Sequence, residues 1–150
     1  MAHRRREMPL PFLAWSDDYL VGIAAIDHDH KTLFKLVNLL HDRIKAGDGD
    51  DAIGDALAGL AVYIGTHFER EERYMDECGY PDVVKHAERH RKLTDTVNSL
   101  KTLYEDDPKQ IKDDMILNFL KGWLTNHILK NDMDYRPYMT GEKKGRFMAT

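Results

Sequence analysis

A chain of 150 residues with 42% hydrophobic and 32% charged residues is long enough for one domain with a substantial buried core. It carries 22 basic and 26 acidic residues, and because both ends are net basic, the body between them is the acidic part, which argues against a nucleic-acid-binding core. A single cysteine, Cys78, excludes an internal disulfide and a cysteine-based zinc or iron–sulfur site. No uncharged apolar run approaches the roughly 20 residues of a membrane helix, and none follows the basic N-terminus as in a secretory signal, so we expect a cytoplasmic protein.

Helical periodicity dominates the chain after an irregular N-terminal arm that Pro9 and Pro11 predict. Gly and Pro residues punctuate each junction between four periodic segments, which run over about 26–44, 53–74, 83–104 and 116–130. Long helices with short connections predict an all-α fold, an antiparallel up-down-up-down four-helix bundle. We expect a single domain over residues 1–150, with its bundle core at about 15–135 and a loosely packed C-terminal tail from Arg136.

Polar residues interrupt the apolar seam of every predicted helix. These residues are His30 in the first helix, His67 and Glu71 in the second, His86 and His90 in the third, and His127 in the fourth. Because neighbouring helices are antiparallel, all of them fall at the same end of the bundle. Burying an unpaired imidazole or carboxylate costs several kcal/mol, so the set needs a common partner.

The spacing of this set suits metal chelation. His67 and Glu71, like His86 and His90, are four residues apart and share one helix face. Asp132 follows His127 by five residues, and on an α-helix that spacing turns its side chain away from the seam. Asp132 therefore joins the site only if the helix ends or bends there.

The number of ligands indicates which metal is bound. Five imidazoles and two carboxylates are too many for one tetrahedral zinc. Two octahedral metals bridged by both carboxylates and by an oxide or hydroxide use the whole set and leave one position open, which suits iron in oxygen chemistry. Carboxylate-rich di-iron bundles use a Glu-x-x-His spacing that is absent here. A histidine-rich site stabilises high oxidation states less, which favours binding dioxygen over activating it.

At these residues the chain resembles the hemerythrin family, specifically the stand-alone bacterial hemerythrins. The resemblance spans Trp15 to Tyr135 and rests on VGIAAIDHDHKTLF (21–34), HFEREERYM (67–75), YPDVVKHAERH (80–90) and WLTNHILKNDMDY (123–135). It implies that one iron is held by His86, His90 and His127 and the other by His30 and His67, with the open position on the second iron. It also implies that Glu71 and Asp132 bridge the irons, and it supports Asp132 as a ligand, because His-x4-Asp recurs in the family as an iron-ligand pair.

One departure from the family pattern precedes the first ligand, where Gln is common and this chain has Asp29. His28 lies roughly 200° around the helix from His30, so both cannot face the irons, and the seam selects His30. We expect His28 to be exposed, with His41 on the helix surface and His3 in the tail. Trp123 and Leu124, within one turn of His127, are predicted to form a dry wall around bound oxygen. We expect an inert Cys78 and only packing roles for Trp15, Tyr63, Phe68 and Tyr74.

The sequence therefore predicts a non-catalytic oxygen carrier or store, with two non-heme iron ions that share an oxo or hydroxo bridge and bind dioxygen reversibly. Its expected partners are dioxygen and an oxygen-consuming recipient protein, with no nucleic acid and no membrane insertion, and we expect a monomer. Two alternatives stay open. One is an oxygen or redox sensor whose basic tails recruit a partner, and the other is a di-iron enzyme acting on peroxide or nitric oxide.

Overall fold

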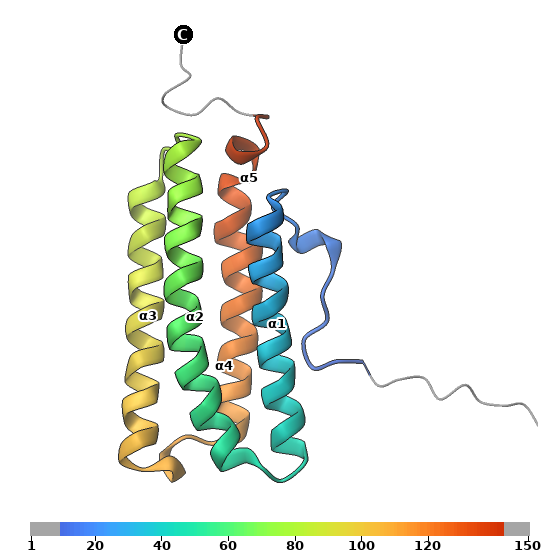
Figure 1. Ribbon diagram of the computed structural model, residues 1–150, viewed down its shortest axis with the longest axis vertical. Coiled ribbons are helices and arrows are strands. Elements are labelled where there is room, and N and C mark those ends of the chain that lie inside the picture. Colours follow the sequence, from blue (N-terminus) through green and yellow to red (C-terminus); the bar gives the residue numbers. More distant parts are fainter. Residues whose placement is uncertain (1–9, 143–150) are drawn as a thin grey trace, which may run out of the picture.

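Four long helices lie side by side in the computed structural model, which describes residues 10–142 (Figure 1). They are α1 (Ala24–Lys45), α2 (Gly49–Glu77), α3 (Val83–Asp106) and α4 (Asp113–Asn126). Single-turn helices precede α1 and α4, namely η1 (Asp17–Tyr19) and η2 (Pro108–Gln110), and α4 continues without a break into a π-helix, η3 (His127–Asp132), and α5 (Met133–Met139). Successive long helices run in opposite directions, so the prediction of an antiparallel four-helix bundle is confirmed.

The apolar periodicity of the sequence becomes the core of the bundle. α2 packs against both α1 and α3, and α1 also packs against α4. The seam residues of α1 illustrate the pattern, since Ile26, Leu33, Val37 and Leu40 are all buried. Tight turns at Gly47 and Gly79, which have φ angles of +88° and +71°, join α1 to α2 and α2 to α3.

The buried apolar side chains form two separate clusters. In the orientation of Figure 1, the larger cluster fills the lower and middle parts of the bundle and includes Leu33 and Ile64. The smaller one closes the upper end and consists of Val21, Ile26, Met75, Tyr80 and Tyr135. Along α1, Ile26 belongs to the upper cluster and Leu33 to the lower one, with the buried His30 between them. A polar layer therefore lies between two apolar ones.

The C-terminal end differs from the sequence prediction. The predictions of a helix ending near Lys130 and of a loose tail from Arg136 are wrong for residues 136–139, because helical structure continues through η3 and α5 to Met139, and the predicted tail over 143–150 lies outside the described residues. Tyr135 is fully buried, and Tyr138 and Met139 pack against the upper cluster. Three apolar side chains spaced i, i+3, i+4 form only one turn of a periodic pattern, too short to stand out in the sequence.

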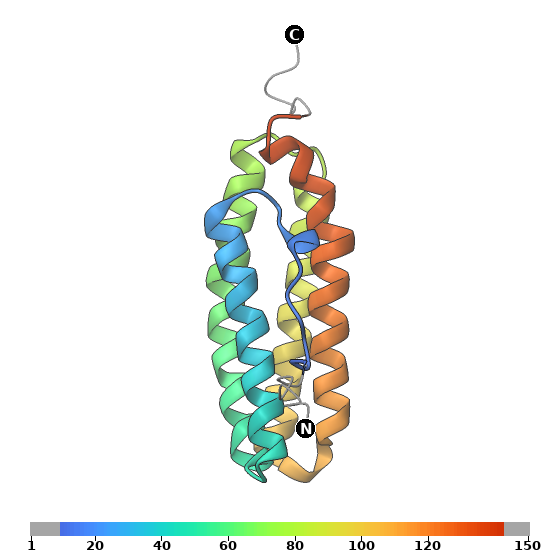
Figure 2. The same ribbon diagram turned by 90° about the vertical axis from the view of Figure 1, so that its right-hand side faces the viewer.

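The N-terminal arm is irregular, as predicted, and it lies along the side of the bundle formed by α1 and α4 (Figure 2). The backbone N–H and carbonyl of Leu13 bond to the side-chain amide of Asn38 on α1, at 2.8 and 2.9 Å. Phe12 stacks on His41 of α1 with ring centroids 4.7 Å apart, and the ammonium of Lys121 on α4 lies 5.0 Å from the Phe12 ring. No helix among residues 10–142 is both long and apolar enough to cross a membrane.

Candidate metal centre

Seven metal-ligand side chains converge between the two apolar clusters. They are His30 of α1, His67 and Glu71 of α2, His86 and His90 of α3, and His127 and Asp132 of η3. Each is buried, with at most 3% of its surface exposed. Their ligand atoms fall into two overlapping groups, each with all atoms within 4.8 Å of one another, and Glu71 belongs to both groups. The structure therefore brings together every metal-site residue that the sequence singled out.

The two carboxylates divide the histidines into a pair and a trio. Glu71 Oε2 lies 3.0 Å from His67 Nε2 and 3.4 Å from His30 Nε2, whereas Glu71 Oε1 lies 2.9 Å from His86 Nε2 and 3.1 Å from His90 Nε2. Asp132 likewise directs its two oxygens to different histidines. Its Oδ2 lies 3.0 Å from His30 Nε2, and its Oδ1 lies 3.1 Å from Nε2 of both His86 and His127.

Each carboxylate thus directs one oxygen toward the pair, His30 and His67, and the other toward the trio, His86, His90 and His127, although Asp132 contacts only His30 of the pair and only His86 and His127 of the trio. This is the arrangement of two adjacent metal positions that share two bridging carboxylates. Both oxygens of Asp132 and Nε2 of His67 are buried and lack a hydrogen bond of good geometry among the described residues. Buried polar atoms in native proteins are ordinarily partnered, so atoms arranged around a common point without such bonds fit a bound cation.

The π-helix explains how Asp132 reaches the centre. A π-helix places its hydrogen bonds between residues five apart instead of four, so residues with that spacing share a face. η3 begins at His127 and ends at Asp132, and both side chains point to the same cluster. An α-helical extension of α4 would have turned the Asp132 side chain away from the seam.

The buried histidines and carboxylates of the centre shift one another's pKa values. Burial alone would lower the pKa of His67, but the charge of Glu71 and the hydrogen bond to Asp29 raise it to about 9. For His127, burial is likewise outweighed by the charge and hydrogen bond of Asp132, which raise the pKa to about 10. Burial would raise the pKa of Glu71, yet the surrounding histidines, His67 first, hold it well below its usual range. The ionised carboxylates create a strongly negative potential that attracts either protons or a metal cation.

Comparison with known proteins agrees with this geometry. The family model described as the hemerythrin HHE cation binding domain matches residues 21–139. The chain belongs to the hemerythrin family. It is 31% identical to the bacteriohemerythrin of Methylococcus capsulatus, over 87% of this chain and 99% of that protein, and 32% identical to the bacteriohemerythrin of Clostridium acetobutylicum, over 81% and 96%.

Solved hemerythrin structures share the fold. A crystal structure of wild-type hemerythrin superposes with a TM-score of 0.76 at 32% identity, covering 85% of this chain and 98% of that one. The crystal structure of a hemerythrin point mutant, with alanine in place of a leucine, gives a TM-score of 0.78 at 30% identity, covering 87% and 99%.

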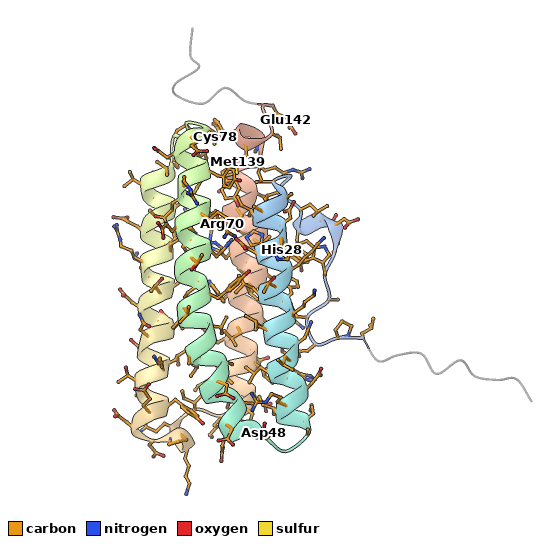
Figure 3. All side chains as sticks on the ribbon, viewed as in Figure 1. His28, Asp48, Arg70, Cys78, Met139 and Glu142 are labelled. Carbon is orange, nitrogen blue, oxygen red and sulfur yellow. The ribbon has the colours of Figure 1, made fainter. Side chains whose placement is uncertain are left out.

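In each histidine group of this hemerythrin-family chain, a carboxylate contacts Nδ1 of one ring, the nitrogen that does not face the cluster. His67 Nδ1 lies 3.1 Å from Oδ2 of Asp29, and Arg70 Nη1 approaches the two Asp29 oxygens at 2.6 and 2.7 Å. Asp29 is itself only 3% exposed, and it also accepts a hydrogen bond from the Tyr63 hydroxyl at 3.1 Å, so Tyr63 does more than pack. Figure 3 shows Arg70 on α2 in the upper half of the bundle, near the height of His28 on α1.

The corresponding contact in the trio joins His90 Nδ1 to Glu72 Oε2 at 3.1 Å. Sequence reasoning missed both carboxylates because neither lies on the seam. The signal at Asp29 was its position directly before His30, where the family commonly has Gln. His28 is exposed, as expected, whereas His41 is partly covered by Phe12, and His3 lies outside the described residues.

Aromatic and aliphatic side chains border the trio. Phe68, expected only to pack, stacks on His90 with ring centroids 3.8 Å apart and planes at 2°. Trp123 meets Phe68 edge-on at 6.5 Å. Trp123 and Leu124 are buried in the lower apolar cluster, at 7% and 1% exposure, so both belong to the dry core that adjoins the centre.

Proposed function

We propose that this chain binds dioxygen reversibly at a non-heme di-iron centre and serves as an oxygen carrier or store. The observation that carries the proposal is the double bridge, in which Glu71 and Asp132 each direct one oxygen toward the trio and the other toward the pair. Glu71 contacts all five histidines, whereas Asp132 contacts His86 and His127 through Oδ1 and His30 through Oδ2. Three imidazoles, two carboxylate oxygens and one bridging oxide or hydroxide complete six positions around one iron. The same bridges with two imidazoles leave the other iron one ligand short, and that open position accepts dioxygen.

In this proposal, the iron-binding residues are His86, His90 and His127 for the six-coordinate iron and His30 and His67 for the iron with the open position. Glu71 and Asp132 bridge them. When bound, the two irons supply the electrons that hold dioxygen reversibly. The names of the bacteriohemerythrin relatives support this assignment.

The residues around the ligands have two tasks. Asp29 and Glu72 accept the Nδ1–H of His67 and His90, which fixes the tautomer of each ring and leaves Nε2 free to bind a metal. The second task is to exclude water, because a hydrated pocket promotes loss of bound oxygen as superoxide. Trp123 and Leu124 are the proposed dry wall, and their burial in the lower cluster supports that role.

A carrier role is favoured over an enzyme by the position of the two cavities that have a metal-ligand histidine in their walls. One cavity is lined by His127 and another by His90, and both histidines belong to the trio, on the far side of Glu71 from the proposed open position. An organic co-substrate in either cavity would therefore face a filled iron. On this ground we propose that the protein is non-catalytic. We also propose that it is a monomeric, cytoplasmic single-domain protein that delivers oxygen to a consuming partner.

The test is an optical titration of the iron-loaded protein. We expect two irons per chain, a colourless reduced form, a charge-transfer band on exposure to air, and loss of that band under argon. A band that appears in air and never reverses would contradict oxygen carriage and favour a sensor. Steady-state peroxide or nitric oxide removal well above that of free iron would favour an enzyme. Fewer than two irons per chain would refute the di-iron assignment.

A further inference from the structure

The groove between α3 and α4 contains a cavity that extends from the exposed side of α3 to the metal-ligand residue His127. It is a cleft open to solvent with a volume of about 520 Å³, within the range of small-molecule sites, and it is lined by residues of α3, α4 and η3. The opposite side of α4 faces α1, where the N-terminal arm lies over the two helices (Figure 2). The arm thus covers the α1–α4 side, whereas the α3–α4 groove is hollow.

The walls of the groove are largely apolar. Leu93 of α3 faces Phe119 and Trp123 of α4 across it, and Gly122 forms part of its floor. A Cβ atom added at Gly122 would meet no neighbouring atom within 4 Å, so the hollow extends to the backbone of α4. Such walls accommodate an aliphatic or aromatic body.

The charge of the groove has one sign. Arg89 and Lys92 of α3, three residues apart and both exposed, line it together with three asparagines, and no carboxylate does. Neighbouring Arg91 pairs with Glu88 at 3.9 Å, whereas no carboxylate within residues 10–142 lies at ion-pair distance from Arg89 or Lys92. Two unpaired cations beside an apolar hollow, in a chain with more acidic than basic residues, match an anionic ligand.

From these observations we propose that the α3–α4 groove binds a small organic carboxylate with an apolar body. The carboxylate group meets Arg89 and Lys92 at the rim, and the apolar body lies over Gly122 against Phe119 and Trp123. This ligand is not a substrate of the metal centre, because the groove ends at His127 of the trio. The binding site does not depend on the proposed oxygen chemistry, but contact with His127 lets an occupant alter the iron spectrum.

Calorimetric titration of the iron-loaded full chain tests the proposal, with octanoate as the probe and uncharged octanamide as its isosteric control. We expect one octanoate per chain and about tenfold weaker binding of octanamide, since the amide lacks the charge that the two rim cations attract. No detectable octanoate binding at about 5 mM, or equal affinity for both compounds, would overturn the proposal.

Two variants locate the site. Because a Cβ atom at position 122 meets no neighbour within 4 Å, Gly122→Phe directs its ring into the hollow and should abolish octanoate binding while iron content and helicity stay unchanged. Its control is Gly59→Phe on α2, where an added Cβ also meets nothing within 4 Å, and which should bind octanoate as the parent does. Arg89→Gln with Lys92→Gln should weaken octanoate binding about tenfold and leave octanamide binding unchanged.

The charge control removes two cations from the same helix outside the groove, as Lys85→Gln with Lys101→Gln. Equal weakening by both double variants would show a general charge effect and overturn the site. Parental octanoate affinity in Gly122→Phe would overturn it as well. A change in the iron absorption spectrum that saturates with octanoate in the parent, and is lost in Gly122→Phe, would support contact with His127.

Discussion

Replacing Asp29 with Asn removes the charge behind His67 while keeping the shape of the side chain. The Asp29 carboxylate accepts the Nδ1–H of His67 at 3.1 Å and binds the Arg70 guanidinium at 2.6 and 2.7 Å. The amide of Asn keeps one acceptor oxygen, so the His67 ring can stay in place. The substitution removes the negative charge that strengthens metal binding at His67 Nε2. This charge stabilises a more highly charged metal ion more than a less charged one.

The magnitude follows from the strength of the lost interaction. A hydrogen bond to a charged group contributes about 1.5–3 kcal/mol and a neutral one about 0.5–1.5 kcal/mol, so Asp29→Asn should cost about 1–1.5 kcal/mol of iron binding at His67. That is about a tenfold loss of affinity, within the range found for partners of metal-bound histidines. The oxidised iron loses more stabilisation than the reduced iron, so the midpoint potential should rise by up to about 60 mV for a one-electron couple.

The assay compares Asp29→Asn with a matched control from the same helix. Asp27 is also buried, but its carboxylate accepts the backbone N–H groups of Val21 and Gly22, at 2.8 and 3.3 Å, instead of touching a histidine. Iron release to a competing chelator and the midpoint potential are measured for both Asn variants. Unchanged values in Asp29→Asn, or the same changes in Asp27→Asn, would refute a specific role for the carboxylate behind His67.

Further predictions concern the pocket, the metal and the π-helix. Leu124→Ala should speed autoxidation several-fold, because it opens a cavity in the proposed dry wall, and decay of the air-induced optical band measures the rate; an unchanged rate would contradict the pocket role. Removing the iron with a chelator should lower the melting temperature in calorimetry, since only the folded chain gathers ligands from three helices and η3, and equal melting temperatures would argue against this centre. Inserting one alanine after Lys130 should rotate Asp132 by about 100° away from His127 and reduce the iron content below two per chain, because the π-helix already accommodates one extra residue, whereas the same insertion after the exposed Gln110 should not.

The bundle and most of the candidate site could be predicted because both are encoded at the same seam positions. An apolar residue every three or four positions predicted the helices. A histidine or Glu71 in place of such a residue indicated a polar side chain that faces the interior of the bundle. Antiparallel order then placed His30, His67, His86 and His127 at one end. This reasoning needs only the period of the helix and the number of helices, which the sequence contains.

The parts that could not be predicted depend on departures from a regular helix or on the packing between helices. Asp132 reaches the centre because η3 adds a residue to its turn, and spacing on a regular helix places it elsewhere, so only the resemblance to the hemerythrin family predicted it as a ligand. Asp29 and Glu72 lie beside the seam, and their contacts with His67 and His90 depend on how closely the neighbouring helices approach. The packing of Tyr135 depends in turn on where the chain goes after η3.

The same π-helix that positions Asp132 also closes the centre from above. Tyr135 follows Asp132 by three residues, is fully buried in the upper cluster and lies with its ring 5.5 Å from that of His86. Burial, together with the charges of Asp132 and Glu71, raises the pKa of Tyr135 well above its usual value, so its phenol stays neutral beside the carboxylates. An α-helical η3 would rotate Asp132 and Tyr135 together, removing a bridging ligand and the apolar cover in one step. The extra residue in this turn therefore links metal binding to closure of the upper end of the bundle.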